Sequence, residues 1–98
     1  MRSVYVVAYD ITDDKRRAKL FKKLKGYGEA LQYSFFRCTL SQSEYLTLRA
    51  EVFDIIDRTQ DRVHVVELGL EEGRGSIAIQ CWGQELKDPA NHKGTLIV

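Results

Sequence analysis

The sequence predicts an α+β domain with an antiparallel sheet, in which strands and helices follow the order βαββαβ and one further strand comes after them. The chain has 98 residues, which suits a single domain of about 50 to 200 residues. Stretches rich in β-branched and aromatic residues alternate with stretches that carry apolar residues at helical spacing. Because 44% of the residues are hydrophobic and only one is proline, collagen-like and disordered chains are excluded.

The first strand is predicted over residues 3–9, where apolar side chains occupy both faces. Such a strand must be buried on both sides, and Asp10 follows at its C-terminal end. Asp13 or Thr12 can cap the next helix, because their side-chain oxygens accept the free N–H groups of a helix start. Basic residues gather toward the helix end, as the helix dipole prefers, and Gly26 stops the helix.

Residues 29–38 are again strand-rich, and we expect a bulge or tight turn near Tyr33 and Ser34. Ser41 and Glu44 have the spacing of a capping box and open a second helix. The apolar residues of this helix recur three or four positions apart and form one stripe, at Tyr45, Leu48, Val52 and Ile55 or Ile56.

Two more strands are predicted over residues 61–68 and 76–82, with a polar turn at residues 71–75 between them. The resulting order is the split βαβ pattern of ferredoxin-like folds and occupies residues 1–84, which leaves residues 85–98 as a C-terminal tail. In that fold both helices cover one face of the sheet. Because the first strand is apolar on both faces, we expect a homodimer that packs through the open sheet face.

Charge is segregated along the chain, although the net charge is only +1. Residues 1–30 hold eight basic and four acidic residues, whereas residues 31–98 hold seven and ten. A basic face of this kind suits an anionic partner. Cys38 and Cys81 are too few for a zinc site or a disulfide framework, and no apolar run is long enough to span a membrane. We therefore expect a cytoplasmic protein without a membrane partner.

Basic residues of the first predicted helix share one side of it at about 100° per residue. Such a stripe either binds backbone phosphates without reading bases or is simply a solvated helix face. Arg17 falls instead in the apolar arc, where a guanidinium needs an acceptor, and Asp10 is the nearest candidate. The stripe consists of Lys15, Arg16, Lys19, Lys22 and Lys23.

Asp10 is the candidate catalytic and metal-binding residue. One carboxylate makes a poor metal site, but two copies of Asp10 converge if the dimer axis runs near the ends of the two first strands. Paired carboxylates and waters suit Mg²⁺, which keeps part of its hydration shell and can activate water for attack on a phosphoryl group. Two structural alternatives are open: an ion pair between Asp10 and Arg17, or a helix-capping role for Asp10.

Three segments carry a resemblance that covers nearly the whole chain: residues 9–17, 27–28 and 31–36. In order and spacing they resemble the CRISPR-associated endoribonuclease family, the small homodimeric partners of the CRISPR adaptation integrase. The resemblance implies a ferredoxin-like fold whose last strand packs onto the other protomer.

The resemblance also implies roles for individual residues. Asp10 matches the family's metal-binding aspartate, while Arg17 and Phe36, with the adjacent Tyr9, match the surroundings of the active site. The chain departs from the family at Ala30, where some members carry a basic residue. It also departs at Arg37, where an acidic residue often stands, so the phosphate contacts need not be the same.

The resemblance implies two functions. One is a scaffold in CRISPR adaptation, the spacer-acquisition step of antiviral defence, in which the dimer binds double-stranded spacer DNA for the integrase. The other is a Mg²⁺-dependent endonuclease that cleaves RNA or double-stranded DNA through Asp10 of both chains, with Arg17 and the basic stripe binding phosphates. The alternative to catalysis is a purely structural, nucleic-acid-binding dimer. A weaker reading is a regulatory domain that binds a small molecule, since fold alone does not specify function.

Overall fold

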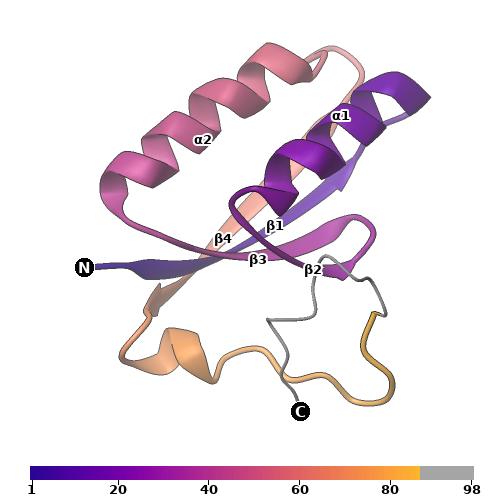
Figure 1. Ribbon diagram of the computed structural model, residues 1–98. Helices are drawn as coiled ribbons and strands as arrows, with labels where there is room; N and C mark the ends of the chain where they lie inside the picture. Colours follow the sequence, from indigo (N-terminus) through magenta and orange to yellow (C-terminus); the bar gives the residue numbers. More distant parts are fainter. Residues whose placement is uncertain (87–98) are drawn as a thin grey trace.

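The computed structural model describes residues 1–86 and confirms the predicted ferredoxin-like α+β fold (Figure 1). Four strands form one antiparallel sheet in the order β2-β3-β1-β4. The elements are β1 (Ser3–Asp10), α1 (Asp14–Lys25), β2 (Gly28–Gln32), β3 (Phe35–Leu40), α2 (Gln42–Ile55), β4 (Arg62–Leu70) and a short 3₁₀ turn, η1 (Arg74–Ser76). Both helices lie on the same face of the sheet, and in the described residues none is long and apolar enough to cross a membrane.

Both helices begin at side chains that the sequence predicts. Asp13 caps α1 by accepting a hydrogen bond from the Arg16 backbone N–H at 2.9 Å. Ser41 and Glu44 form both halves of the capping box at the start of α2. These contacts satisfy N–H groups that have no partner within the helix, which is why the helix limits can be predicted from local sequence.

The central strand β1 has apolar residues on both faces because it is covered on both faces. It pairs with β3 on one side and β4 on the other, so that Val7 lies between Phe36 and Val65 in the register. Alternation along β1 turns Tyr5, Val7 and Tyr9 toward the helices, where they join the main core. The fully buried large side chains of this core are Phe36, Leu20, Leu24 and Cys38.

The other face of β1 is partly covered within the same chain, although a second copy was the simplest expected cover. Val4 and Val6 face away from the helices and are nevertheless only 2% and 8% exposed. The reason is that the chain turns back after β4 and runs beneath the sheet (Figure 1). Gly75 of η1 lies so close to Val4 that an added Cβ would stand 2.9 Å from its Cγ2.

The additional strand predicted over residues 76–82 does not form in this structure. Ser76 ends η1, and residues 77–82 make no ladder with the four-stranded sheet. A strand needs a neighbouring edge to satisfy its backbone groups, and this segment pairs with none in the described part of the chain. Ile77 and Trp82 are accordingly 64% and 89% exposed. Most of the predicted tail, residues 87–98, lies outside the described residues.

Phe36 gives a direct test of this core. Its ring has no exposed surface and lies 5.2 Å from the Phe21 ring and 6.4 Å from the Tyr9 ring, measured between centroids. The substitution Phe36→Ala is expected to lower the free energy of unfolding by about 3–5 kcal/mol in urea denaturation, because it leaves a cavity. Leu46→Ala, on the exposed side of α2, is the matched control and should change it by less than about 0.5 kcal/mol. Equal effects of the two substitutions would contradict the described packing.

Candidate functional site

Asp10 ends β1 on the sheet face opposite the helices. It follows Val4, Val6 and Ala8 at two-residue spacing and is exposed. Its neighbour across the ladder is Arg62 of β4. Within residues 1–86 no hydrogen bond or ion pair engages the Asp10 carboxylate, so both of its oxygens are available to a ligand.

Two structural roles were considered for Asp10, an ion pair with Arg17 and a helix cap, and other residues fill both of them. Asp13 caps α1, and Arg17 forms its ion pair with Asp14 instead of Asp10. Arg17 also donates a hydrogen bond from Nη1 to the Ile11 carbonyl oxygen at 2.8 Å. Its side chain is 46% exposed and therefore does not lie in the core.

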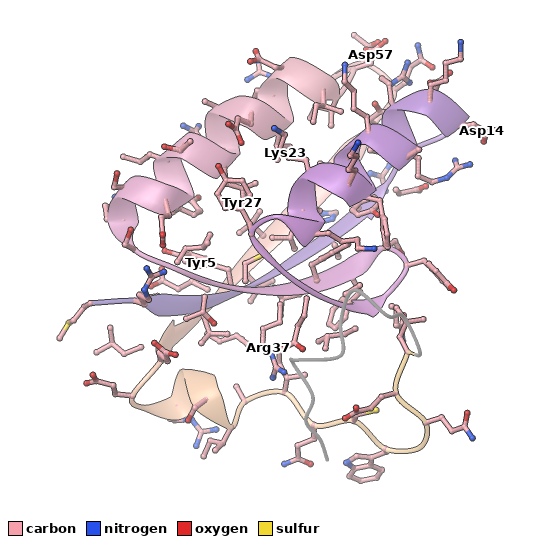
Figure 2. All side chains as sticks on the ribbon, in the orientation of Figure 1. Tyr5, Asp14, Lys23, Tyr27, Arg37 and Asp57 are labelled. Atoms are coloured by element: carbon pink, nitrogen blue, oxygen red, sulfur yellow. The ribbon has the colours of Figure 1, made fainter. Side chains whose placement is uncertain are left out.

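The predicted basic stripe of α1 divides into two groups. Arg16 pairs with Asp61 in the loop before β4, with Nε 2.7 Å from Oδ2. Lys23 lies between the two helices, and its Nζ is 3.6 Å from Glu51 Oε1 (Figure 2). Both side chains are therefore engaged within the fold. The three that are exposed and have no partner in the described residues are Lys15, Lys19 and Lys22.

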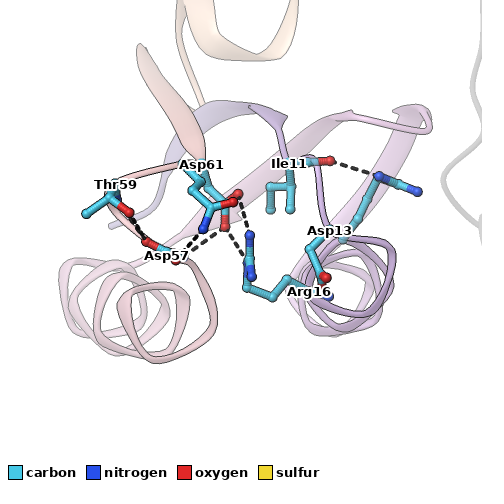
Figure 3. A network of polar contacts seen from close by, with 8 residues as sticks. Ile11, Asp13, Arg16, Asp57, Thr59 and Asp61 are labelled. Atoms are coloured by element: carbon cyan, nitrogen blue, oxygen red, sulfur yellow. Dashed lines mark hydrogen bonds and ion pairs between the residues drawn. The ribbon is translucent and has the colours of Figure 1, made fainter.

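A partly buried polar cluster joins the start of α1 to the loop before β4 (Figure 3). The Asp61 side chain has no exposed surface, and it accepts hydrogen bonds from Arg16 Nε at 2.7 Å, Arg16 Nη2 at 3.1 Å and the Asp57 backbone N–H at 2.8 Å. The bond from Arg16 is the main reason that the pKa of Asp61 lies below its usual range, although burial acts in the opposite direction. A hydrogen bond from the Thr12 backbone N–H acts in the same sense as Arg16.

Sequence reasoning missed Asp61 as a member of the site. Its partner Arg16 is 45 positions away, and no local pattern marks such a pair. An aspartate between a helix and a strand is also an ordinary loop residue. The one available signal is that Asp61 stands directly before Arg62, which faces Asp10 across the ladder.

Tyr9 and Phe36 lie on the helix side of the sheet, the face opposite Asp10. The Tyr9 hydroxyl donates a hydrogen bond to the Tyr33 carbonyl oxygen at 2.6 Å. Burial raises the pKa of Tyr9 to about 12, although the nearby Arg17 acts to lower it. Tyr9 is therefore protonated at neutral pH. Both residues pack against the end of β1 on the helix side of the sheet, whereas Asp10 lies on the opposite face.

At the end of β1 one chain offers Mg²⁺ one free carboxylate, that of Asp10. Within residues 1–86 no three His, Cys, Asp or Glu side chains gather into a group that could hold a metal ion. Carboxylate oxygens are nevertheless the ligands that Mg²⁺ prefers, and the ion commonly keeps several waters while it binds one or two carboxylates. The exposed Asp10 carboxylate thus fits a hydrated Mg²⁺ ion when a second chain supplies another carboxylate.

A pocket lies between α2 and β4 on the helix side of the sheet. Its volume is about 120 Å³, and its walls are mostly apolar, including Tyr45, Val52 and Val65. Small-molecule sites usually measure about 300–1,000 Å³ and contain convergent polar groups. The pocket therefore gives little support to the reading of a small-molecule regulatory domain.

Comparison with known proteins adds independent information. The sequence model of the family described as "CRISPR associated protein Cas2" matches residues 2–73. The CRISPR-associated endoribonuclease Cas2 3 of Chloroflexus aurantiacus is 41% identical over 92 residues, which are 94% of this chain and 98% of that protein. The protein of the same name from Synechocystis is 38% identical over 81 residues, 83% of this chain and 85% of that protein. The crystal structure of Streptococcus pyogenes Cas2 resembles the fold with a TM-score of 0.69 at 22% identity, over 82% of this chain and 99% of that chain.

Asp61 makes stability depend on pH in the acid range. The pKa of Asp61 is lower in the folded chain than in the unfolded chain, where the pKa of an aspartate is about 3.9. Ionised Asp61 therefore stabilises the fold above about pH 4, and this contribution is lost as the pH falls through the folded-state pKa.

Urea denaturation from about pH 7 to about pH 2 is expected to show a smaller pH dependence for Asp61→Asn than for the wild type. Asp54→Asn changes an exposed aspartate of α2 and should keep the wild-type dependence. The account of Asp61 is wrong if both substitutions leave the pH dependence unchanged.

Proposed function

Because the chain belongs to the family of CRISPR-associated Cas2 proteins, we propose that it acts as a homodimer that cleaves phosphodiester bonds of RNA or DNA with Mg²⁺. The two curated relatives described above are named endoribonucleases. The observation that carries the proposal is the Asp10 carboxylate, which is exposed, unengaged within residues 1–86, and placed on the face opposite the helices.

The second copy joins at the edge of the sheet formed by β4. This strand has a neighbour on one side only, so one row of its backbone groups is unpaired in the described structure. Val65 and Val66 point to opposite faces and are 47% and 51% exposed. Residues 76–82 have a strand-like sequence without a strand partner in the same chain. Pairing of residues 76–82 with β4 of the partner satisfies the unpaired backbone groups of both segments. This pairing agrees with the dimer that the family resemblance implies.

In a two-fold dimer a residue near the axis meets its own copy, so an axis near the end of β1 gives one site two carboxylates, from Asp10 of both chains. When bound, Mg²⁺ supplies neutralisation of charge on the scissile phosphate and a lowered pKa for a coordinated water. Asp10 holds the ion. Arg62, which is exposed beside Asp10 in the ladder, offers positive charge to the phosphate and reduces the repulsion between the two carboxylates.

The substitution Asp10→Asn tests the enzymatic function, because it keeps the shape of the side chain and removes its charge. Mg²⁺-dependent cleavage of labelled single-stranded RNA and double-stranded DNA is expected to fall by about 100-fold or more. Asp54→Asn makes the same chemical change on the exposed side of α2 and should cleave like the wild type. Cleavage that persists in a folded, dimeric Asp10→Asn protein would remove Asp10 from the mechanism.

A second candidate function is a scaffold in CRISPR adaptation, in which the dimer binds double-stranded spacer DNA for the larger integrase. The observation that favours it is the row of exposed lysines on α1 at Lys15, Lys19 and Lys22. Such side chains bind backbone phosphates whatever the base sequence. This function needs no catalysis, so it is the purely structural alternative to the nuclease.

The lysine row can be tested by DNA binding at several salt concentrations. Replacing the three lysines with glutamine is expected to make the slope of log K against log salt shallower by roughly 0.9 for each lost phosphate contact. A matched control removes three exposed charges elsewhere and should keep the wild-type slope, by changing Arg49, Arg58 and Arg74 to glutamine. Equal slopes for the two triple variants would show that general charge, and not the α1 row, binds DNA.

A further inference from the structure

The loop between β1 and α1, residues 11–13, begins directly after Asp10 and is anchored at both of its ends. The Ile11 side chain is 3% exposed, and its carbonyl oxygen accepts a hydrogen bond from Arg17. Asp13 caps α1. Thr12 lies between them and is exposed. The position of the Asp10 carboxylate therefore depends on what holds this loop.

Asp61 connects the first turn of α1 with the loop before β4 (Figure 3). Its two carboxylate oxygens accept hydrogen bonds from Nε and Nη2 of Arg16, the third residue after the helix cap Asp13. The residue after Asp61 is Arg62, which pairs with Asp10 in the register of β1 and β4. Asp61 thus holds Arg16, whose backbone N–H donates to Asp13 of this loop, and it adjoins the strand that flanks Asp10.

Arg16 makes this contact in a form that a lysine cannot reproduce. Its planar guanidinium donates two hydrogen bonds to one carboxylate, and its side chain is only 25% exposed. Separating such a pair would leave the fully buried Asp61 carboxylate without its counter-charge, which is strongly unfavourable. Arg16 is thereby committed to Asp61 and is not a free phosphate contact like the exposed lysines of α1.

We propose that Arg16 and Asp61 are positioning residues for Asp10, and that their bidentate pair sets the Mg²⁺ affinity of the dimer. This inference rests on the proposed function, because it requires Mg²⁺ to bind at Asp10. The reason is geometric, since metal ligands must be held to within about 0.5 Å. Removing a group that orients a metal ligand typically weakens metal binding by about 10–100-fold.

The substitution Arg16→Lys separates a positioning role from a phosphate contact. It keeps the positive charge but loses the planar guanidinium that donates two hydrogen bonds to one carboxylate. Calorimetric titration of the full-length dimer with Mg²⁺ alone is expected to show about tenfold or greater loss of affinity for Arg16→Lys and for Asp61→Asn. Lys19→Gln, on the exposed side of the same helix, should keep the wild-type Mg²⁺ affinity.

Binding of a single-stranded RNA without Mg²⁺ supplies the second readout. Arg16→Lys and Arg16→Gln should both keep the wild-type salt slope, whereas Lys19→Gln should make it shallower by about 0.7. If Arg16→Gln changes the slope as Lys19→Gln does, Arg16 is a phosphate contact and the inference is overturned.

Asp10→Asn distinguishes failure of this inference from failure of the proposed function. If Asp10→Asn weakens Mg²⁺ binding and Arg16→Lys does not, the positioning role is wrong while the metal site at Asp10 stands. If Asp10→Asn binds Mg²⁺ as the wild type does, or neither protein binds it, both are wrong. Thermal melting checks that each variant is folded, and Arg16→Lys alone decides the question if Asp61→Asn does not fold.

Discussion

The rest of the structure depends on the burial of β1. This strand lies between two neighbouring strands, and other parts of the chain cover it on both faces. Its backbone is paired with β3 and β4, and its apolar side chains fill the core on one face and meet η1 on the other. A charged residue inside this strand would carry a large desolvation cost. Asp10 therefore stands where the burial ends, and it keeps the fixed backbone of the strand while its carboxylate stays in solvent.

The charges around this strand end have separate tasks. Arg16, Arg17 and Lys23 are engaged with carboxylates of the fold, which leaves the outward lysines of α1 for an anionic partner. One free carboxylate at the end of β1 of each chain is a weak basis for catalysis. Two-fold symmetry changes this, because one residue per chain becomes two ligands in the dimer. A homodimer is thus part of the chemistry that we propose and not only a means of stabilisation.

Features that depend on neighbouring residues could be predicted from the sequence, and features that depend on distant ones could not. Asp13, the capping box at Ser41 and the turn near Tyr33 follow from local chemistry, and the structure confirms them. A helix projection shows which side of α1 Arg16 occupies, but it cannot show that Arg16 forms an ion pair with Asp61 on that side. Residues 76–82 have strand composition, yet a strand also needs an edge, and composition cannot show whether that edge belongs to the same chain.

The central claim is that Asp10 of two chains holds one Mg²⁺ ion, and the stoichiometry of Mg²⁺ binding tests it most directly. Titration of the dimer should give one ion for every two chains, and the site should be lost in Asp10→Asn. One ion per chain, or binding that survives the loss of the Asp10 charge, would contradict the account.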